Sequence, residues 1–128
     1  MNRVFINPAH VIEIHVIGDQ TAESVIAMCD KVIQLIEKLG SQSRPIYIID
    51  NLKAMGETTP DARSAVAYYA KNLHFNRVAM VGDGSIMMRL GTNLMLRAIG
   101  KSNIRYFSSI DSALLWFGLE PSELHATI

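Results

Sequence analysis

Three times along this chain, a short apolar segment is followed by a polar or glycine-rich turn and then by a helical pattern. The apolar segments begin at Ile46, Val78 and Ile104. Each is bounded by turn residues and almost uninterrupted in its apolar character, which is typical of strands covered on both faces of a parallel sheet. Strands that alternate with helices favour βαβ units, and such sheets bind ligands beyond the carboxyl ends of their strands. The turns after these three strands are therefore the first place to look for function.

The N-terminal part predicts a different arrangement. Residues 4–6 and 10–17 read as two strands joined by a short turn, so they must pair antiparallel, because parallel neighbours need a long crossover. A helix is then expected from Thr21, as its N-cap, to Leu39, with Gly40 just past its end. Cys29 lies on the apolar stripe of this helix, which favours a buried small hydrophobe over a reactive thiol.

Three more helices are predicted. Thr59 caps one that starts with Pro60, a second covers residues 85–99, and the last covers residues 110–117 before Gly118. The order ββαβαβαβα predicts a single α/β domain over residues 1–118, followed by a tail at residues 119–128. Its sheet would be mixed but mostly parallel, with four or five strands, an antiparallel N-terminal pair and about four helices covering it.

Composition excludes several classes of protein. The chain has 128 residues, with 12 basic and 12 acidic side chains and no net charge, so no global field attracts it to nucleic acid. No stretch approaches the roughly 20 apolar residues of a membrane-spanning helix. A single cysteine rules out an internal disulfide scaffold. We therefore expect a cytoplasmic protein without an integral membrane segment.

The turn after the second parallel strand reads Gly82-Asp83-Gly84-Ser85. Its glycines allow a tight turn, after which the amides of a helix N-terminus could face an anion. The segment matches neither a P-loop nor a dinucleotide-binding fingerprint. A plain turn with a helix cap is the simpler explanation of this segment.

Two further features of these turns suggest chemistry. Asp50 and Asp83 follow neighbouring predicted strands, and a carboxylate pair can hold Mg²⁺ or transfer protons, although both residues are also common turn formers. Thr58 and Thr59 precede a helix, where a phosphate would meet free backbone amides, although N-capping alone accounts for Thr59. No histidine stands at metal-ligand spacing, so we predict no metal, no cofactor and no catalytic residue.

The predicted helix at residues 85–99 carries more apolar surface than one sheet contact covers. Methionine-rich faces rimmed by arginine often bind partners or lipids, although a wide core stripe is the simpler explanation. Such a wall would suit a lipid-like ligand, peripheral contact with a membrane, or a homodimer interface. Its residues would be Met87, Met88, Arg89, Met95, Leu96 and Arg97.

The strand order, the segment Arg77–Asp83 and the ending with Tyr106-Phe107 and Ala113–Phe117 resemble the SpoIIAA-like proteins, within the STAS (sulfate transporter and anti-sigma factor antagonist) fold. The resemblance covers the chain from the first strand to Trp116. It implies a small non-enzymatic module that binds partner proteins or small ligands, and the group is also compared with CRAL-TRIO lipid-binding domains. The antagonists are switched by phosphorylation of a serine at the start of the second helix. This chain has Thr58 and Thr59 there instead.

We therefore predict a non-catalytic binding or regulatory module that docks a partner protein or small ligand at a rim of strand ends and helix N-termini. The rim residues are Asp50, Thr58, Thr59, Gly82, Asp83, Gly84 and Ser85. A carrier of a lipid-like or hydrophobic small molecule, using the methionine-rich helix, is the alternative hypothesis. A third hypothesis is a small Mg²⁺-dependent enzyme or nucleotide-binding protein that uses Asp50 and Asp83.

Overall fold

The fold is given by a computed structural model that describes residues 1–83 and 103–121. Their main element is a five-stranded sheet with the strand order β1-β2-β4-β6-β7. The strands are β1 (Arg3–Ile6), β2 (Ile12–His15), β4 (Tyr47–Asn51), β6 (Arg77–Val81) and β7 (Ile104–Phe107). The predicted helix at residues 85–99 and most of the predicted tail lie outside the described residues.

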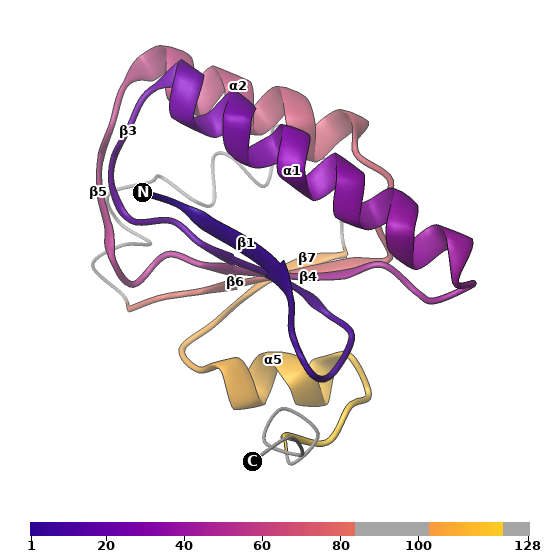
Figure 1. The fold of residues 1–128 in the computed structure, drawn as a ribbon. Coiled ribbons are helices and arrows are strands. Elements are labelled where there is room, and N and C mark those ends of the chain that lie inside the picture. The colour runs from indigo at the N-terminus through magenta and orange to yellow at the C-terminus, as the bar shows by residue number, and fades with distance from the viewer. Residues whose placement is uncertain (84–102, 122–128) are drawn as a thin grey trace.

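Strand directions confirm the predicted mixed sheet. β1 pairs antiparallel with β2, and the pairs β2–β4, β4–β6 and β6–β7 are all parallel. Parallel neighbours need a crossover connection, and within the described residues each crossover contains a helix. Figure 1 shows α1 (Ala22–Ser41) and α2 (Pro60–Asn72) side by side over one face, with α5 (Ile110–Trp116) on the other. The predicted α/β domain is thus confirmed, with three helices in the described part of the chain.

Helix starts follow the predicted capping signals. The Thr21 hydroxyl accepts a hydrogen bond from the Ser24 amide, and the Ser24 hydroxyl accepts one from the Thr21 amide, which forms a capping box. The hydroxyls of Thr59 and Ser109 cap α2 and α5 by accepting hydrogen bonds from the Ala62 and Ser112 amides. These side chains satisfy amides that would otherwise lack partners in the first turn of each helix.

The end of α1 differs from the prediction. Gly40 lies inside the helix, which continues to Ser41, and the left-handed residue is Ser43, with φ of 57°. The residues after the helix still satisfy its last carbonyls. The Gln42 and Arg44 amides donate to the Leu39 carbonyl, and the Ser43 amide donates to the Gly40 carbonyl. A serine thus takes the position that the sequence assigned to glycine.

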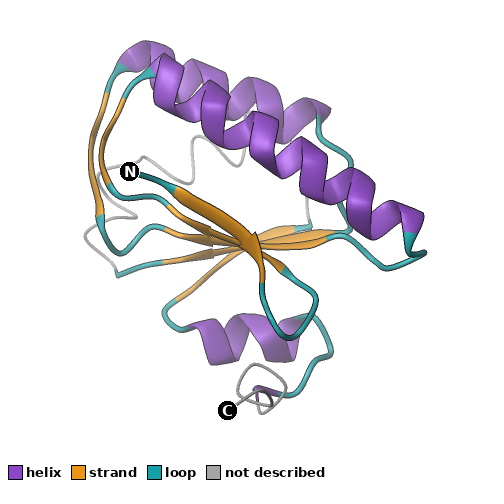
Figure 2. Cartoon of the chain, viewed as in Figure 1, coloured by secondary structure: helices purple, strands orange, loops and turns teal. Residues whose placement is uncertain are grey.

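A second, two-stranded sheet was missed by the sequence analysis. β3 (Gly18–Gln20) and β5 (Met55–Thr58) pair parallel as a ribbon that leads into α1 and α2 (Figure 2). Both strands are short and polar, so they show no alternation of apolar residues. A carboxylate oxygen of Asp19 accepts a hydrogen bond from the Glu57 amide at 2.8 Å. Gly56 permits this contact, since a Cβ there would lie 2.2 Å from the same oxygen.

The two faces of the large sheet bury separate cores. Alternate residues of each strand point to opposite faces, so Ile12 and Ile14 pack toward α1 and α2 while Ile49 packs toward α5. A third, smaller cluster joins the two long helices through Val25, Cys29 and Ala62. The helices α1 and α2 therefore contact both each other and the sheet.

Candidate functional site

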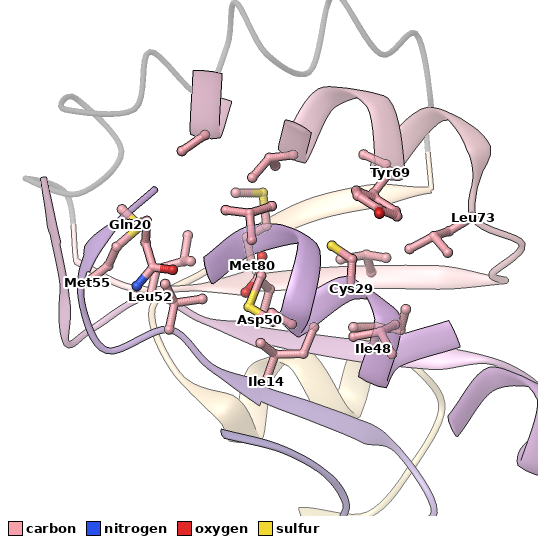
Figure 3. A pocket seen from close by; sticks show the side chains of 18 of the residues that line it. Ile14, Gln20, Cys29, Ile48, Asp50, Leu52, Met55, Tyr69, Leu73 and Met80 are labelled. Atoms are coloured by element: carbon pink, nitrogen blue, oxygen red, sulfur yellow. The ribbon is translucent and has the colours of Figure 1, made fainter. Parts of the chain in front are cut away.

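A cavity of about 130 Å³ lies between the large sheet and the helices α1 and α2. Its described lining comes from four strands of the sheet, from both helices and from the ribbon, and is almost wholly apolar. Figure 3 shows these side chains around the open space. The lining includes Ile14, Ile48, Met80, Val32, Val66 and Leu73. A space of this size resembles the engineered cavities that hold benzene.

Asp50 is the exception to the apolar lining. It belongs to β4, where it pairs in register with Ile14 of β2 and Met80 of β6, and it lies among the cavity residues in Figure 3. Its Oδ1 is buried and has no hydrogen-bond partner among the described residues. Burial raises the pKa of Asp50 from 3.8 to about 7, because the ionised carboxylate is poorly solvated there.

Two polar groups project toward the same cavity from the helices. Cys29 of α1 is buried, as predicted, and burial, followed by the charges of Asp50 and Asp30, raises the pKa of its thiol to about 12. Burial also raises the pKa of Tyr69 on α2, with smaller effects from Asp30, Cys29 and Tyr68. Both groups therefore stay protonated at neutral pH, and the thiol is not a nucleophile.

At the ribbon end of the cavity, the polar groups already have partners. The Arg63 guanidinium donates to the carbonyl of Thr58 at 2.9 Å and to its hydroxyl at 3.3 Å. The buried Gln20 amide donates to Asn2 Oδ1 at 3.0 Å and to the Ile17 carbonyl at 3.1 Å. This end of the cavity is thus internally satisfied, which leaves Asp50 as the group that lacks a complement among the described lining residues.

The structure separates the surroundings of the two aspartates that the sequence placed on one rim. The strands β4 and β6 are neighbours, as predicted. However, Asp50 lies within β4 and lines the cavity, whereas Asp83 follows β6 and is exposed. The Gly82 amide, one residue before Asp83, donates to the Phe107 carbonyl at 3.2 Å. Burial, with a smaller effect of the Asp83 charge, raises the pKa of Tyr106.

The other rim residues divide in the same way. Thr58 ends β5 and lines the cavity with Asp50. Thr59 is exposed, accepts the Ala62 amide at 3.2 Å as the N-cap of α2, and donates to the Asp61 carboxylate. Gly84, Ser85 and the wall of Met87, Met88, Arg89, Met95, Leu96 and Arg97 lie outside the described residues.

One polar cluster on the α5 side of the sheet was not predicted. Glu13 is only 7% exposed, and its carboxylate accepts a hydrogen bond from Asn7 Nδ2 at 3.1 Å. Its other oxygen lies 2.5 Å from Nε2 of His15, two residues further along β2. The sequence signal was the spacing of two residues in a strand, which places both side chains on one face. No three metal-ligating side chains meet within residues 1–83 and 103–121.

Comparison with known proteins agrees with this geometry. A sequence profile described as SpoIIAA-like matches residues 11–118. The chain belongs to the SpoIIAA-like family. A crystal structure of an uncharacterised protein from Shewanella loihica PV-4 with a SpoIIAA-like fold is similar to this SpoIIAA-like chain, with a TM-score of 0.63 and 16% identity. The alignment covers 90% of this chain and 92% of the other. No curated protein sequence matches this SpoIIAA-like chain significantly.

Membership of this family supports a regulatory or binding module, and STAS-like domains are generally non-enzymatic. Among the described helices of this SpoIIAA-like chain, none combines the length and the hydropathy needed to span a bilayer.

Proposed function

We propose that this SpoIIAA-like protein is a non-catalytic binding module that takes a small, mostly apolar molecule into the cavity beneath α1 and α2. The observation that carries the proposal is the cavity of about 130 Å³ with its almost wholly apolar lining. Protein interiors are normally close-packed, so an apolar space of this size leaves contacts unmade that a ligand would supply. The cysteine is buried and unpaired, which suits a reducing compartment, and we place the protein in the cytoplasm.

The position of the cavity supports a regulatory use of this binding. Its lining includes Thr58, and Arg63 ties the carbonyl and hydroxyl of Thr58 to the first turn of α2. A ligand would therefore contact the element that starts α2, and a partner protein at the predicted rim would sense occupancy through this contact. Docking of a partner protein at the exposed Thr59 and Asp83 is the second candidate function, with Thr58 as its phosphorylation site.

Binding to the cavity can be tested with toluene as a neutral probe, by following methyl NMR signals of Ile14, Ile48 and Met80. We expect these signals to shift on addition of toluene, because all three side chains line the cavity. Ala70→Leu, which fills the cavity from α2, should abolish the shifts and raise the melting temperature. Ala70→Val is the fallback if leucine overpacks the site.

Ala67→Leu is the matched control, because it adds the same volume to the same helix at a residue outside the cavity lining. Toluene should still bind to this variant. Methyl signals that do not respond to toluene in the wild-type protein would exclude the cavity as a binding site and leave partner docking as the function to test.

A further inference from the structure

Asp50 gives the cavity a specific chemistry. We infer that the cavity selects a small amine, with an apolar body of about six or seven carbons, whose ammonium group pairs with the Asp50 carboxylate. This inference rests on the proposed function, and it adds the class of ligand. It follows from a buried carboxylate oxygen without a described partner inside a lining that is otherwise apolar.

Charge decides the class of ligand. A buried carboxylate is costly unless a hydrogen-bond donor or a positive charge accompanies it. The cation among the described lining residues is Arg63, an exposed residue whose guanidinium is bonded to Thr58. A ligand ammonium would therefore supply what the lining lacks, namely donors and a compensating charge for Oδ1.

Charge also disfavours the commonest amphiphiles as ligands. A fatty acid or another carboxylate would bring a second negative charge beside Asp50, and like charges at such a site disfavour each other. A hydrocarbon of the same shape would fill the volume but leave Oδ1 without a partner. The cavity should thus rank an amine first, a hydrocarbon second and a carboxylate last.

Ligand binding should depend on pH because Asp50 titrates near neutrality, at a pKa of about 7. The other titratable groups that face it do not change charge in this range. The Cys29 thiol on α1 and the Tyr69 hydroxyl on α2 both have raised pKa values, and the cationic side chain on α2, Arg63, is bonded to Thr58. An aliphatic amine is also protonated throughout, like a lysine side chain at about 10.4.

Below the pKa of Asp50, binding of the ammonium must expel the carboxyl proton to the buffer. Above it, the carboxylate is already ionised, so no proton moves. The affinity of the amine should therefore fall about tenfold between pH 8 and pH 6, while one proton per ligand is released at the lower pH.

The experiment titrates the protein at pH 8 with cyclohexylamine, methylcyclohexane and cyclohexanecarboxylate, and follows the cavity methyl signals. We expect the amine to bind at least about tenfold more tightly than the hydrocarbon, and the carboxylate to have the lowest affinity of the three. Asp50→Asn should remove the preference for the amine and leave the hydrocarbon affinity unchanged. Asp111→Asn, an exposed aspartate on α5, is the control and should behave like the wild type. Calorimetry in two buffers of different ionisation enthalpy measures the proton released at pH 6.

The possible results separate the two proposals. Equal affinities for amine and hydrocarbon, or a preference that survives Asp50→Asn, would overturn the role of Asp50 and leave the binding function intact. A protein that binds none of the three probes would overturn both. Preference for the amine, lost in Asp50→Asn and weakened at pH 6, would establish the ligand class.

Discussion

At the scale of single residues, the structure joins two titrating side chains that the sequence analysis treated separately. Asp50 and Cys29 line the same cavity from the sheet and from α1, and the charge of Asp50 contributes to the raised pKa of the thiol. Strongly shifted pKa values are concentrated at functional sites, because titratable side chains there are buried and poorly solvated. Each of the two residues makes a direct prediction.

Asp50 should make the protein less stable as the pH rises. Its pKa is 3.8 in the unfolded chain and about 7 in the folded one, so the folded state binds more protons between these values. The free energy of unfolding therefore falls as the pH increases from about 4 to about 7, by on the order of 3 kcal/mol at about 1.4 kcal/mol per pKa unit.

Asp50→Asn cannot ionise, so its melting temperature should exceed that of the wild type at pH 8 and approach it near pH 4. Thermal unfolding of both proteins across this range measures the difference. An equal dependence on pH in the two proteins would mean that solvent reaches the carboxylate in the folded state.

Cys29 should resist modification in the native protein. Its pKa of about 12 leaves almost no thiolate at pH 8, and the side chain is buried. Ellman's reagent should therefore react with the native thiol at least an order of magnitude more slowly than with the denatured chain. Rapid reaction under native conditions would show that α1 opens readily above the cavity.

At the scale of the elements, the start of each long helix is specified by local side chains. Thr59 caps α2 by accepting the Ala62 amide. Replacing it with alanine should cost about 1 kcal/mol of stability, whereas Thr59→Asp should retain most of it, because aspartate also caps. Urea unfolding of the three proteins tests the difference, and unchanged stability in Thr59→Ala would mean that the hydroxyl does not stabilise the helix.

The β3–β5 ribbon depends on one glycine. A Cβ at residue 56 would lie 2.2 Å from the Asp19 carboxylate and 3.1 Å from the Asp19 amide nitrogen, so Gly56→Ala should displace the carboxylate and destabilise the fold. In an Asp19→Ala background the side-chain clash is absent, and the further cost of Gly56→Ala should be smaller. A double-mutant cycle on the free energy of unfolding measures this coupling, and strictly additive effects would contradict it.

At the scale of the whole molecule, stability depends on burial between the layers rather than on apolarity alone. Leu39 on α1 is fully buried, whereas Leu115 on α5 is 59% exposed. Leu39→Ala should cost about 2–5 kcal/mol, and Leu115→Ala less than about 0.5 kcal/mol. Chemical denaturation measures both, and similar losses would show that Leu115 is covered in solution by another surface.

The sequence was sufficient to predict the large sheet because its signals are local and strong. Uninterrupted apolar strands, the caps Thr21 and Thr59, and the short turn before β2 each specify one element. The ribbon was missed because Gly18–Gln20 and Met55–Thr58 are polar and become strands only through each other. Asp50 was predicted to lie at a rim where its strand ends, whereas it lies within β4 and lines the cavity. Its spacing of two residues from Ile48 was the signal that both face α1 and α2.

The parallel pairing of β3 and β5 has an electrical consequence for the helices that follow them. Since both strands enter their helices from the ribbon, α1 and α2 start together and run in the same direction (Figure 1). Their macrodipoles are therefore aligned, with like poles adjacent, although the chain has no net charge. Glu23 and Asp61 in the first turns, and Lys38 and Lys71 in the last turns, oppose these poles. Exchanging the acids for the lysines would preserve composition and net charge. It would nevertheless place like charges at each pole and so weaken the association of the two helices.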